Sequence, residues 1–501
     1  MTLLREETPS IGASPLDVEA LIKEARRLRR RRWVIGSSLV LLTCLVAGLV
    51  LGIGGSSTPR SKTVGHVPTG RPSPTVNLRA FAHEGELAFI SRSTLWEIDG
   101  STGTLRALPS VSGFHPSSPE ISPDGKWLAY LETQANPSNN LARNELWIAD
   151  ANGTDAHELR VASVGGLYGW EPAHDVLALP IEGKTVGNTA GIDLVSPSGT
   201  VRRLVTFPTS PPLASQEWVE GAVWSPDGSQ LAVSFDDHVF TNGSTTLVAY
   251  SVNGGRPTTW LWLKGSNTTL LGMRYVFAFP AGWWEKWGIG FWVTGGGATH
   301  NIDQTPLAVI AKPGAAAKVI GQTLSDDPDE ALAAGPSGQL AIVDNPTNFS
   351  GRLLAENKVL EVCDPKTTTC TPVRASNSIV TSEPAWSPSG DALAFTEAPS
   401  TELIDQLGQP GVAAWYAEHK LYVYRPATHS LQGIANASGA TAPTWSWNGK
   451  SILYVSNDGL WLLPTLSQRP VKIASPLFPP DNWSSYFAQV DWVGHFSWSS
   501  R

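Results

Sequence analysis

The stretch GAVWSPDGSQLAVSF, residues 221–235, consists of two short apolar segments joined by the turn sequence Ser225-Pro226-Asp227-Gly228. Serine suits the first position of a type I turn, proline fixes φ at the second position, and glycine suits the fourth. The residues on both sides alternate as they do in half-buried strands. The stretch therefore predicts a β-hairpin, and the fold depends on how often this hairpin recurs.

The hairpin recurs along the chain, which indicates an array of structural repeats. Clear copies are PEISPDGKWLAY (119–130), PAWSPSGDALAF (384–395) and PTWSWNGKSILYV (443–455). Weaker copies are GWEPAHDVLAL (169–179), AAGPSGQLAIV (333–343) and WWEKWGIGFWV (283–293). A second apolar segment, such as LVAYS (247–251), follows each copy. Most of these segments end in glycine-containing turns typical of hairpins, so each unit holds about four strands in roughly 50 residues.

A repeat of this size is typical of β-propellers, in which neighbouring sheets around an axis bury each other's faces. The first unit begins directly at a second strand, ELAFIS (86–91), whereas the last segment, 487–498, contains a lone first strand, QVDWVGHF. We therefore expect an all-β propeller of about eight four-stranded blades, whose C-terminal strand completes the N-terminal blade. Seven blades would result if the weak unit near Trp284 were an insertion.

The composition agrees with many short strands. The 501 residues include 47 Gly, 38 Pro and 21 Trp, and only 16% of the residues are charged. Tryptophans at hairpin positions, such as Trp224, Trp386 and Trp445, are expected to pack between blades. The formal net charge of −8 argues against nucleic acid as a partner of the folded part.

The N-terminal region predicts a membrane anchor. Residues 1–32 form a cytoplasmic tail with a basic juxtamembrane helix, and residues 33–54 form a charge-free apolar run long enough for a transmembrane helix. Because the basic residues precede this run, the positive-inside rule places the N-terminus in the cytoplasm. The arginines expected to contact anionic lipid headgroups are Arg26, Arg27, Arg29, Arg30, Arg31 and Arg32.

Residues 55–78 are rich in Gly, Ser, Thr and Pro, which predicts a flexible linker between the anchor and the propeller. The propeller, residues 79–501, is then expected outside the cell, as part of a single-pass protein of the plasma membrane. An uncleaved anchor is favoured over a cleaved signal peptide, because the apolar run is longer than a usual signal-peptide core and the tail before it is long.

The hairpins resemble the TolB-type, WD40-like β-propeller repeat, whose mark is P-x-W-S-P-D-G-x-x-L-A-Y. The matching positions are Pro119, Ser122, Pro123, Asp124, Gly125, Leu128, Ala129, Tyr130, Trp224, Ser225, Pro226, Asp227, Gly228, Leu231, Ala232, Pro384, Trp386, Ser387, Pro388, Gly390, Leu393 and Ala394. The resemblance covers roughly residues 80–498 and implies the fold rather than a chemistry, since the matching residues make turns and packing contacts. TolB-like domains are often six-bladed, whereas this chain has more units. Tail, anchor and propeller together resemble actinobacterial cell-surface proteins.

Two local features are candidate sites. Cys363 and Cys370 bracket the turn CDPKTTTC, and outside the cytoplasm a disulfide can form across this hairpin; the alternative is two buried free thiols. The densest aromatic cluster fits core packing, with a carbohydrate- or peptide-binding platform as the alternative. Its members are Trp283, Trp284, Trp287 and Trp292.

The sequence contains no recognised catalytic motif, such as a Gly-x-Ser-x-Gly elbow or a His-Glu-x-x-His metal site. The expected innermost strands look mostly apolar or small beside their tryptophans. We therefore expect no cofactor, no metal site and no enzyme. The favoured function is a non-catalytic, membrane-anchored, extracytoplasmic module that binds or scaffolds a protein or cell-wall ligand.

The alternative function is a propeller enzyme that acts on glycans or lactones, with its site in the central channel. Charged residues on the innermost strands would favour this alternative, because those strands line the channel of a propeller. The fold by itself does not decide between the two functions, since one fold hosts many activities.

Overall fold

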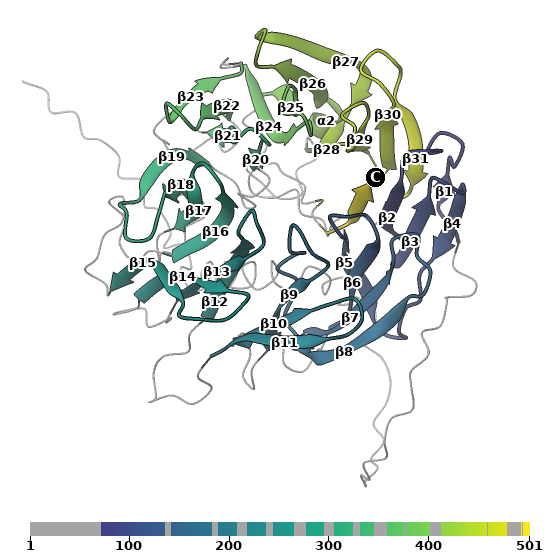
Figure 1. The fold of residues 1–501 in the computed structure, drawn as a ribbon. Coiled ribbons are helices and arrows are strands. Elements are labelled where there is room, and N and C mark those ends of the chain that lie inside the picture. Colours follow the sequence, from purple (N-terminus) through teal and green to yellow (C-terminus); the bar gives the residue numbers. More distant parts are fainter. Residues whose placement is uncertain are drawn as a thin grey trace, which may run out of the picture.

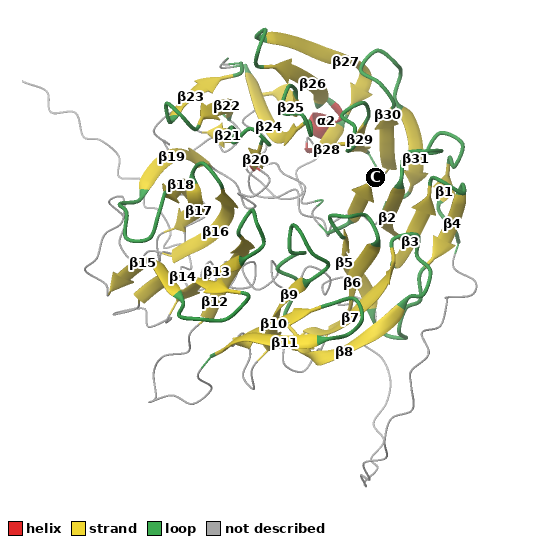
Figure 2. Cartoon of the chain, in the orientation of Figure 1, coloured by secondary structure: helices red, strands yellow, loops and turns green. Residues whose placement is uncertain are grey.

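The computed structural model describes residues 72–135, 142–182, 189–207, 218–236, 244–264, 277–294, 305–323, 331–344, 358–374, 376, 378–400, 412–457, 459–477, 492 and 494–500. These residues form strands almost exclusively, with one short helix, α2 (Val412–Ala417) (Figure 2). The strands build an all-β propeller of eight blades around a central opening (Figure 1). The expected fold class is confirmed, and the weak unit near Trp284 is a blade rather than an insertion.

Each blade extends from an innermost strand beside the central opening to an outermost strand at the rim. In that order, blade 1 consists of β32 (Phe496–Ser499), β2 (Glu86–Ser91), β3 (Thr94–Asp99) and β4 (Thr104–Ala107). Blade 2 consists of β5 (His115–Ile121), β6 (Trp127–Ala135), β7 (Ala142–Asp150) and β8 (His157–Val164). Blade 3 consists of the segment around Trp170, which forms one bridge to Leu177, followed by β9 (Leu177–Glu182), β10 (Thr189–Val195) and β11 (Val201–Thr206). One pairing, of Val164 with Ile181, joins β8 to β9, so blades 2 and 3 belong to one seven-stranded sheet. Blade 4 consists of β12 (Trp218–Trp224), β13 (Gln230–Asp236), β14 (Ser244–Ser251) and β15 (Thr258–Lys264).

The second half of the ring follows the same order. Blade 5 consists of β16 (Phe277–Trp284), β17 (Gly288–Thr294), β18 (Thr305–Ile310) and β19 (Lys318–Thr323). Blade 6 consists of β20 (Leu332–Ala334), β21 (Leu340–Asp344), β22 (Val359–Asp364) and β23 (Thr369–Pro372). Blade 7 consists of β24 (Ile379–Trp386), β25 (Leu393–Pro399), β26 (Lys420–Arg425) and β27 (Ser430–Ser438), and blade 8 of β28 (Ala440–Trp445), β29 (Ile452–Ser456), β30 (Gly459–Leu463), β31 (Val471–Ser475) and β1 (Thr75–Val76).

The two ends of the ring meet at blades 1 and 8. The C-terminal strand β32 pairs with β2, with Phe496 opposite Phe89, and so completes the N-terminal blade as expected. The N-terminal strand β1 pairs with β31 on the outer edge of blade 8, with Thr75 opposite Ser475. The pairing of β32 supplies the inner strand that blade 1 would otherwise lack, and β1 extends blade 8 by one strand at its outer edge.

The hairpin turns have the geometry that their sequence predicts. In blade 4, the Gly228 N–H donates to the Ser225 carbonyl (2.9 Å), and Gly228 has φ of +69°. The Ser225 hydroxyl donates to Asp227 Oδ1 (2.7 Å) and accepts from the Gln230 N–H (2.9 Å). Serine and aspartate therefore hold the turn together, and glycine supplies the left-handed conformation that other residues adopt only with strain.

Three hairpin tryptophans join neighbouring blades at their inner edges. The indole N–H of Trp170 donates to the Glu120 carbonyl (3.1 Å), that of Trp224 to the Gly169 carbonyl (3.1 Å) and that of Trp445 to the Ala385 carbonyl (3.0 Å). In each case the acceptor lies on the inner segment of the preceding blade. These rings are buried, so they pack between blades as expected.

The described part of the chain includes no helix long and apolar enough to cross a membrane. The expected tail (1–32), transmembrane helix (33–54) and most of the linker (55–78) lie outside the described residues. The anchor and the arginines beside it therefore stay predictions.

Replacing Gly228 with alanine tests the packing of the hairpin turn. A Cβ at this position would lie 1.3 Å from Glu171 Oε1 of blade 3, so the buried Glu171 side chain would have to move. Gly254→Ala is the matched control, because Gly254 also has a positive φ (+85°) but no atom within 4 Å of such a Cβ. We expect Gly254→Ala to cost about 1 kcal/mol and Gly228→Ala at least about 1 kcal/mol more. Equal losses in denaturant unfolding would contradict this interpretation.

Candidate functional site

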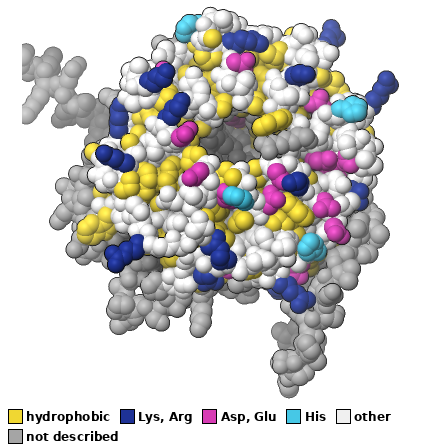
Figure 3. Space-filling view, viewed as in Figure 1, with side chains coloured by type: hydrophobic (Ala, Val, Ile, Leu, Met, Phe, Trp, Pro, Cys, Tyr) yellow, Lys and Arg dark blue, Asp and Glu magenta, His cyan; other side chains and the backbone are white. Residues whose placement is uncertain are grey.

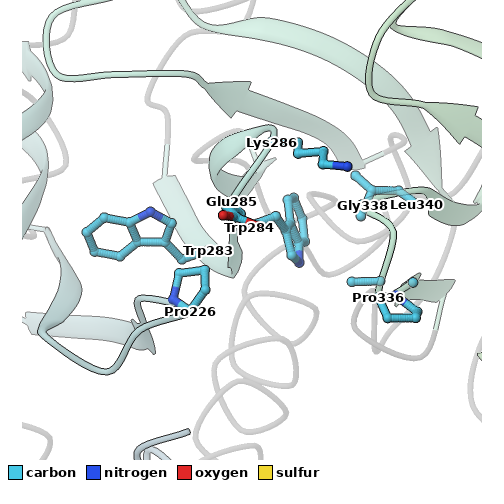
Figure 4. Close-up of a pocket in the computed structure, with 10 residues that line it drawn as sticks. Pro226, Trp283, Trp284, Glu285, Lys286, Pro336, Gly338 and Leu340 are labelled. Atoms are coloured by element: carbon cyan, nitrogen blue, oxygen red, sulfur yellow. The ribbon is translucent and has the colours of Figure 1, made fainter. Parts of the chain in front are cut away.

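The structure separates the four tryptophans of the expected aromatic cluster. Trp287 and Trp292 are buried in the core between blades 5 and 6. Trp283 and Trp284 are half-buried and border a pocket with a volume of about 210 Å³ (Figure 4). Only these two are therefore placed to touch a ligand.

Cys363 and Cys370 lie opposite each other on β22 and β23 of blade 6. The structure joins them in a disulfide across this hairpin. Cys363 is fully buried, and the bridge lies at the outer part of the blade, away from the central opening.

The inner segments of four blades carry glutamates. Each of these segments is otherwise mostly apolar or small, as expected, but carries one acidic residue. One feature of the sequence could have indicated these glutamates: each lies within a few residues of the hairpin turn of its own blade. The glutamates are Glu120, Glu171, Glu220 and Glu383.

Glu383 lies midway along β24, in a β-bulge where its backbone has φ of +53°. Its Oε2 accepts a hydrogen bond from the Ala442 N–H of blade 8 (3.1 Å) and one from the Thr396 hydroxyl of β25 (3.2 Å). Burial raises the pKa of Glu383 to about 7, although these hydrogen bonds and the positive charge of Lys358 oppose the shift. Bulges often re-aim a side chain beside an active site.

Lys358 interacts electrostatically with Glu383 and also with a second buried titratable group, His419. Lys358 precedes β22 of blade 6, and His419 precedes β26 of blade 7; their residues are 4% and 2% exposed. Burial, together with the positive charge of Lys358, lowers the pKa of His419 to about 4, although a hydrogen bond with the Ala440 backbone opposes the shift. At neutral pH the imidazole of His419 is therefore uncharged, and the carboxyl group of Glu383 is near its midpoint of titration.

Glu120 and Glu171 support the incomplete inner segment of blade 3. The Glu120 carboxylate accepts a hydrogen bond from the Trp170 N–H (3.2 Å), and burial raises the pKa of Glu120 to about 7. Glu171 pairs with His174 through Oε2 and Nδ1 (2.7 Å). Glu220 is also buried, on β12 of blade 4. The Glu120 contact joins blades 2 and 3 and the Glu171 contact lies within blade 3, whereas Glu383 interacts with the positive charge of Lys358.

The described part of the molecule is hollowed at its centre in the view of Figure 3. Hydrophobic and acidic side chains gather around this hollow, with a few Lys, Arg and His side chains between them. Within the described ranges, no group of three or more His, Cys, Asp or Glu side chains is arranged to hold a metal ion.

No protein-family model matches the chain, and no curated protein matches it in sequence. Among solved structures, the dipeptidyl peptidase 4 of Porphyromonas gingivalis is similar over 81% of this chain and 60% of its own, with a TM-score of 0.53 and 11% identity. An oligogalacturonate lyase in complex with manganese is similar over 80% of this chain and 89% of its own (TM-score 0.39, 11% identity). One of two prolyl endopeptidases is similar over 76% of this chain and 57% of its own (TM-score 0.42, 13% identity).

These comparisons correct one expectation. The chain was expected not to be an enzyme, and the comparisons contradict this expectation, since the dipeptidyl peptidase 4 to which its propeller is similar is an enzyme. At identities of 9–14%, the likeness shows the propeller fold and no particular reaction. The chain spans about 60% of the peptidase, so the activity of that whole protein does not transfer. Any chemistry must be argued from the side chains themselves.

The raised pKa of Glu383 predicts a pH-dependent stability. Between pH 4.5, its ordinary value, and about 7, the folded chain keeps a proton that the unfolded chain releases. This contribution is fully present below pH 4.5 and is lost as the pH rises through 7. Relative to Glu383→Gln, the native protein should lose on the order of 3 kcal/mol across this window in denaturant unfolding.

A control for this prediction uses a carboxylate whose pKa is shifted in the opposite direction. Hydrogen bonds from Ser225 and Ser229 lower the pKa of Asp227, so its contribution is present at neutral pH and lost on acidification. Asp227→Asn should therefore change the pH dependence with the opposite sign. Parallel curves for the native protein and Glu383→Gln from pH 4.5 to 7.5 would contradict the assignment.

Proposed function

We propose that this propeller is an enzyme that acts on a glycan or a lactone in its central channel, with Glu383 as the group that transfers the proton. The observation that carries the proposal is the Glu383 carboxyl group, held between the inner strands of blades 7 and 8 with a pKa of about 7. A general acid or base works best when its pKa lies near the operating pH, and burial is how enzymes raise a glutamate to that range.

The surroundings of Glu383 suit proton transfer. The Ala442 N–H and the Thr396 hydroxyl fix the carboxyl group from two blades, so little reorganisation accompanies a reaction. The charge of Lys358 favours the ionised form of Glu383 and would also stabilise negative charge developing on a substrate.

The glycan or lactone class follows from the kind of chemistry that such a group supports. Cleavage of a glycosidic bond needs a carboxyl group that protonates the leaving oxygen or activates a nucleophile. Opening of a lactone likewise needs a base near neutral pH to activate water. We take the central hollow in the view of Figure 3 as the place where a chain-like or small cyclic substrate would enter.

Turnover of a panel of polysaccharides, aryl glycosides and lactones by the full chain tests this proposal. We expect activity on at least one class, and Glu383→Gln should lower kcat by about 100-fold or more, as loss of a general acid or base does. The kcat profile of the native protein should show an apparent pKa near 7.

The control is Glu361→Gln. Burial, with the charge of Asp344, raises the pKa of Glu361 as well, but this residue lies on β22, the third strand of blade 6. It should leave kcat unchanged. Full activity of Glu383→Gln, or no turnover of any member of the panel, would overturn the proposal.

We also propose that the enzyme is anchored in the plasma membrane by residues 33–54, with the propeller outside and anionic lipid bound near the arginines of residues 26–32. The same proposal includes a relationship to TolB-type, WD40-like propellers of actinobacteria. It also includes the binding of a protein or cell-wall partner. The support is the charge-free apolar run preceded by a basic block.

Protease treatment of intact cells tests the topology. The propeller should be digested while a tag at residue 1 stays protected, since the basic block is expected to remain inside. Digestion of the tag with protection of the propeller would reverse the orientation, and release of the protein by high salt alone would exclude the anchor.

A further inference from the structure

A pocket on the turn face joins blades 4, 5 and 6. Its volume is about 210 Å³, and its walls are the side chains of Trp283, Trp284, Pro226 and Pro336 (Figure 4). Glu285 and Lys286, both exposed, border it. We call this feature the Trp284 pocket. Aromatic and proline rings with a few polar groups at the edge are the usual composition of a small-ligand site.

The indole ring of Trp284 packs against two glycines. A Cβ on Gly282 would lie 2.6 Å from this ring, and a Cβ on Gly290 would lie 2.2 Å from it. The ring therefore rests on the bare backbone of β16 and β17, where any other residue would displace it. One ring face is covered by the sheet, so the ring presents its remaining surface to the pocket.

The other walls are held in place by contacts between blades. Trp283 packs edge-to-face on Trp260, with ring centroids 5.1 Å apart. The Trp287 indole N–H donates to the Gly338 carbonyl (2.7 Å), and Lys286 Nζ donates to the Ser337 carbonyl (2.8 Å). These bonds fix the hairpin tips of blades 5 and 6 relative to each other, so the pocket is preformed.

Blades 5 and 6 depart from the repeated hairpin at this pocket. Blade 4 has Ser225-Pro226-Asp227-Gly228 at its tip, whereas blade 5 has Glu285-Lys286-Trp287 and blade 6 has Gly335-Pro336-Ser337-Gly338. The register shows that Trp283 opposes Ile289 as Trp224 opposes Leu231, so Trp284 is an added aromatic residue. A repeat that breaks its own structural pattern indicates a functional site.

We infer that the Trp284 pocket binds one pyranose ring of an uncharged saccharide. Its volume lies below the range of about 300–1,000 Å³ that is typical for drug-sized ligands, so it fits a single ring. The apolar C–H face of a sugar ring packs on an indole ring, and its hydroxyls would bond to Glu285 and Lys286. One acid and one base give the pocket no net charge to select a charged sugar.

The main competing ligand is a proline-rich peptide, which also binds to aromatic surfaces. Such peptides are extended and use a groove with several successive subsites. The Trp284 pocket is short and bounded by Pro336 on one side and by Pro226 and Trp283 on the other, so it favours a single ring (Figure 4). The inference does not depend on the proposed catalytic role of Glu383.

Calorimetric titration of the full chain with uncharged methyl glycosides tests the inference. The protein is kept in a detergent without a sugar headgroup, and a proline-rich peptide is titrated in parallel. We expect saturable binding of at least one glycoside, which Trp284→Ala weakens by about tenfold or more. Glu383→Gln should bind equally well, so failure of this inference and failure of the proposed reaction are distinguishable.

Two further variants separate loss of the site from loss of the fold. Ala334→Phe fills the pocket from an exposed position on blade 6 and leaves the glycines under Trp284 unchanged. It should weaken binding as much as Trp284→Ala does. Trp447→Ala removes another exposed tryptophan, from the hairpin turn of blade 8, and should leave binding unchanged. Unchanged binding in Ala334→Phe, binding of the peptide alone, or no glycoside binding would each overturn the inference.

Discussion

The ring depends on a hydrogen bond that crosses from one blade to the inner segment of the blade before it. Trp170, Trp224 and Trp445 each insert an indole ring between blades and donate the indole N–H to a backbone carbonyl of the preceding inner segment. The Gly169 carbonyl also accepts the Ala178 N–H of its own blade (3.2 Å), so the indole N–H of Trp224 adds a second, inter-blade bond to a carbonyl that is already paired. The indole ring buries apolar area between the two blades, and its N–H bonds to a carbonyl of the preceding blade. One side chain therefore sets both the spacing and the register of adjacent blades.

The departures from this arrangement are informative. Trp386 is buried but its ring lies over Gly335, where blade 6 lacks the serine of the other hairpins, and its indole nitrogen has no hydrogen-bond partner among the described residues. In blade 3, the inner segment is reduced to one bridge, and the Glu120 carboxylate accepts the Trp170 N–H in place of a strand. Side chains therefore replace ladder hydrogen bonds where the repeat weakens, and this brings carboxylates to the inner wall.

The local chemistry of the hairpins could be predicted from the sequence, because the residues 225–228 that make the turn are also neighbours in the chain. Ring closure by β32 could be predicted for a similar reason, since the first unit lacks one strand and the last segment offers one. The environment of Glu383 could not be predicted. Its donor Ala442 is 59 residues away and its cation Lys358 comes from another blade, so its burial and raised pKa exist only in the assembled ring. Likewise, the spacing of the clustered tryptophans does not reveal which of them the core covers.

The seam between blades 1 and 8 has a mechanical consequence. Strand β1 contributes two residues to the outer edge of blade 8, and Asn77 adds one more backbone bond to Ile473 (2.8 Å). Tension applied to the chain before Thr75 therefore acts first on this short outer strand. The strand that completes blade 1, β32, is held separately, with the Trp498 indole N–H bonded to the Glu84 carbonyl (2.7 Å) and the Ser497 hydroxyl to the Ile121 N–H (3.0 Å). Detachment of β1 would free a few residues of chain while the ring stays closed, so this outer strand can yield under tension without opening the propeller.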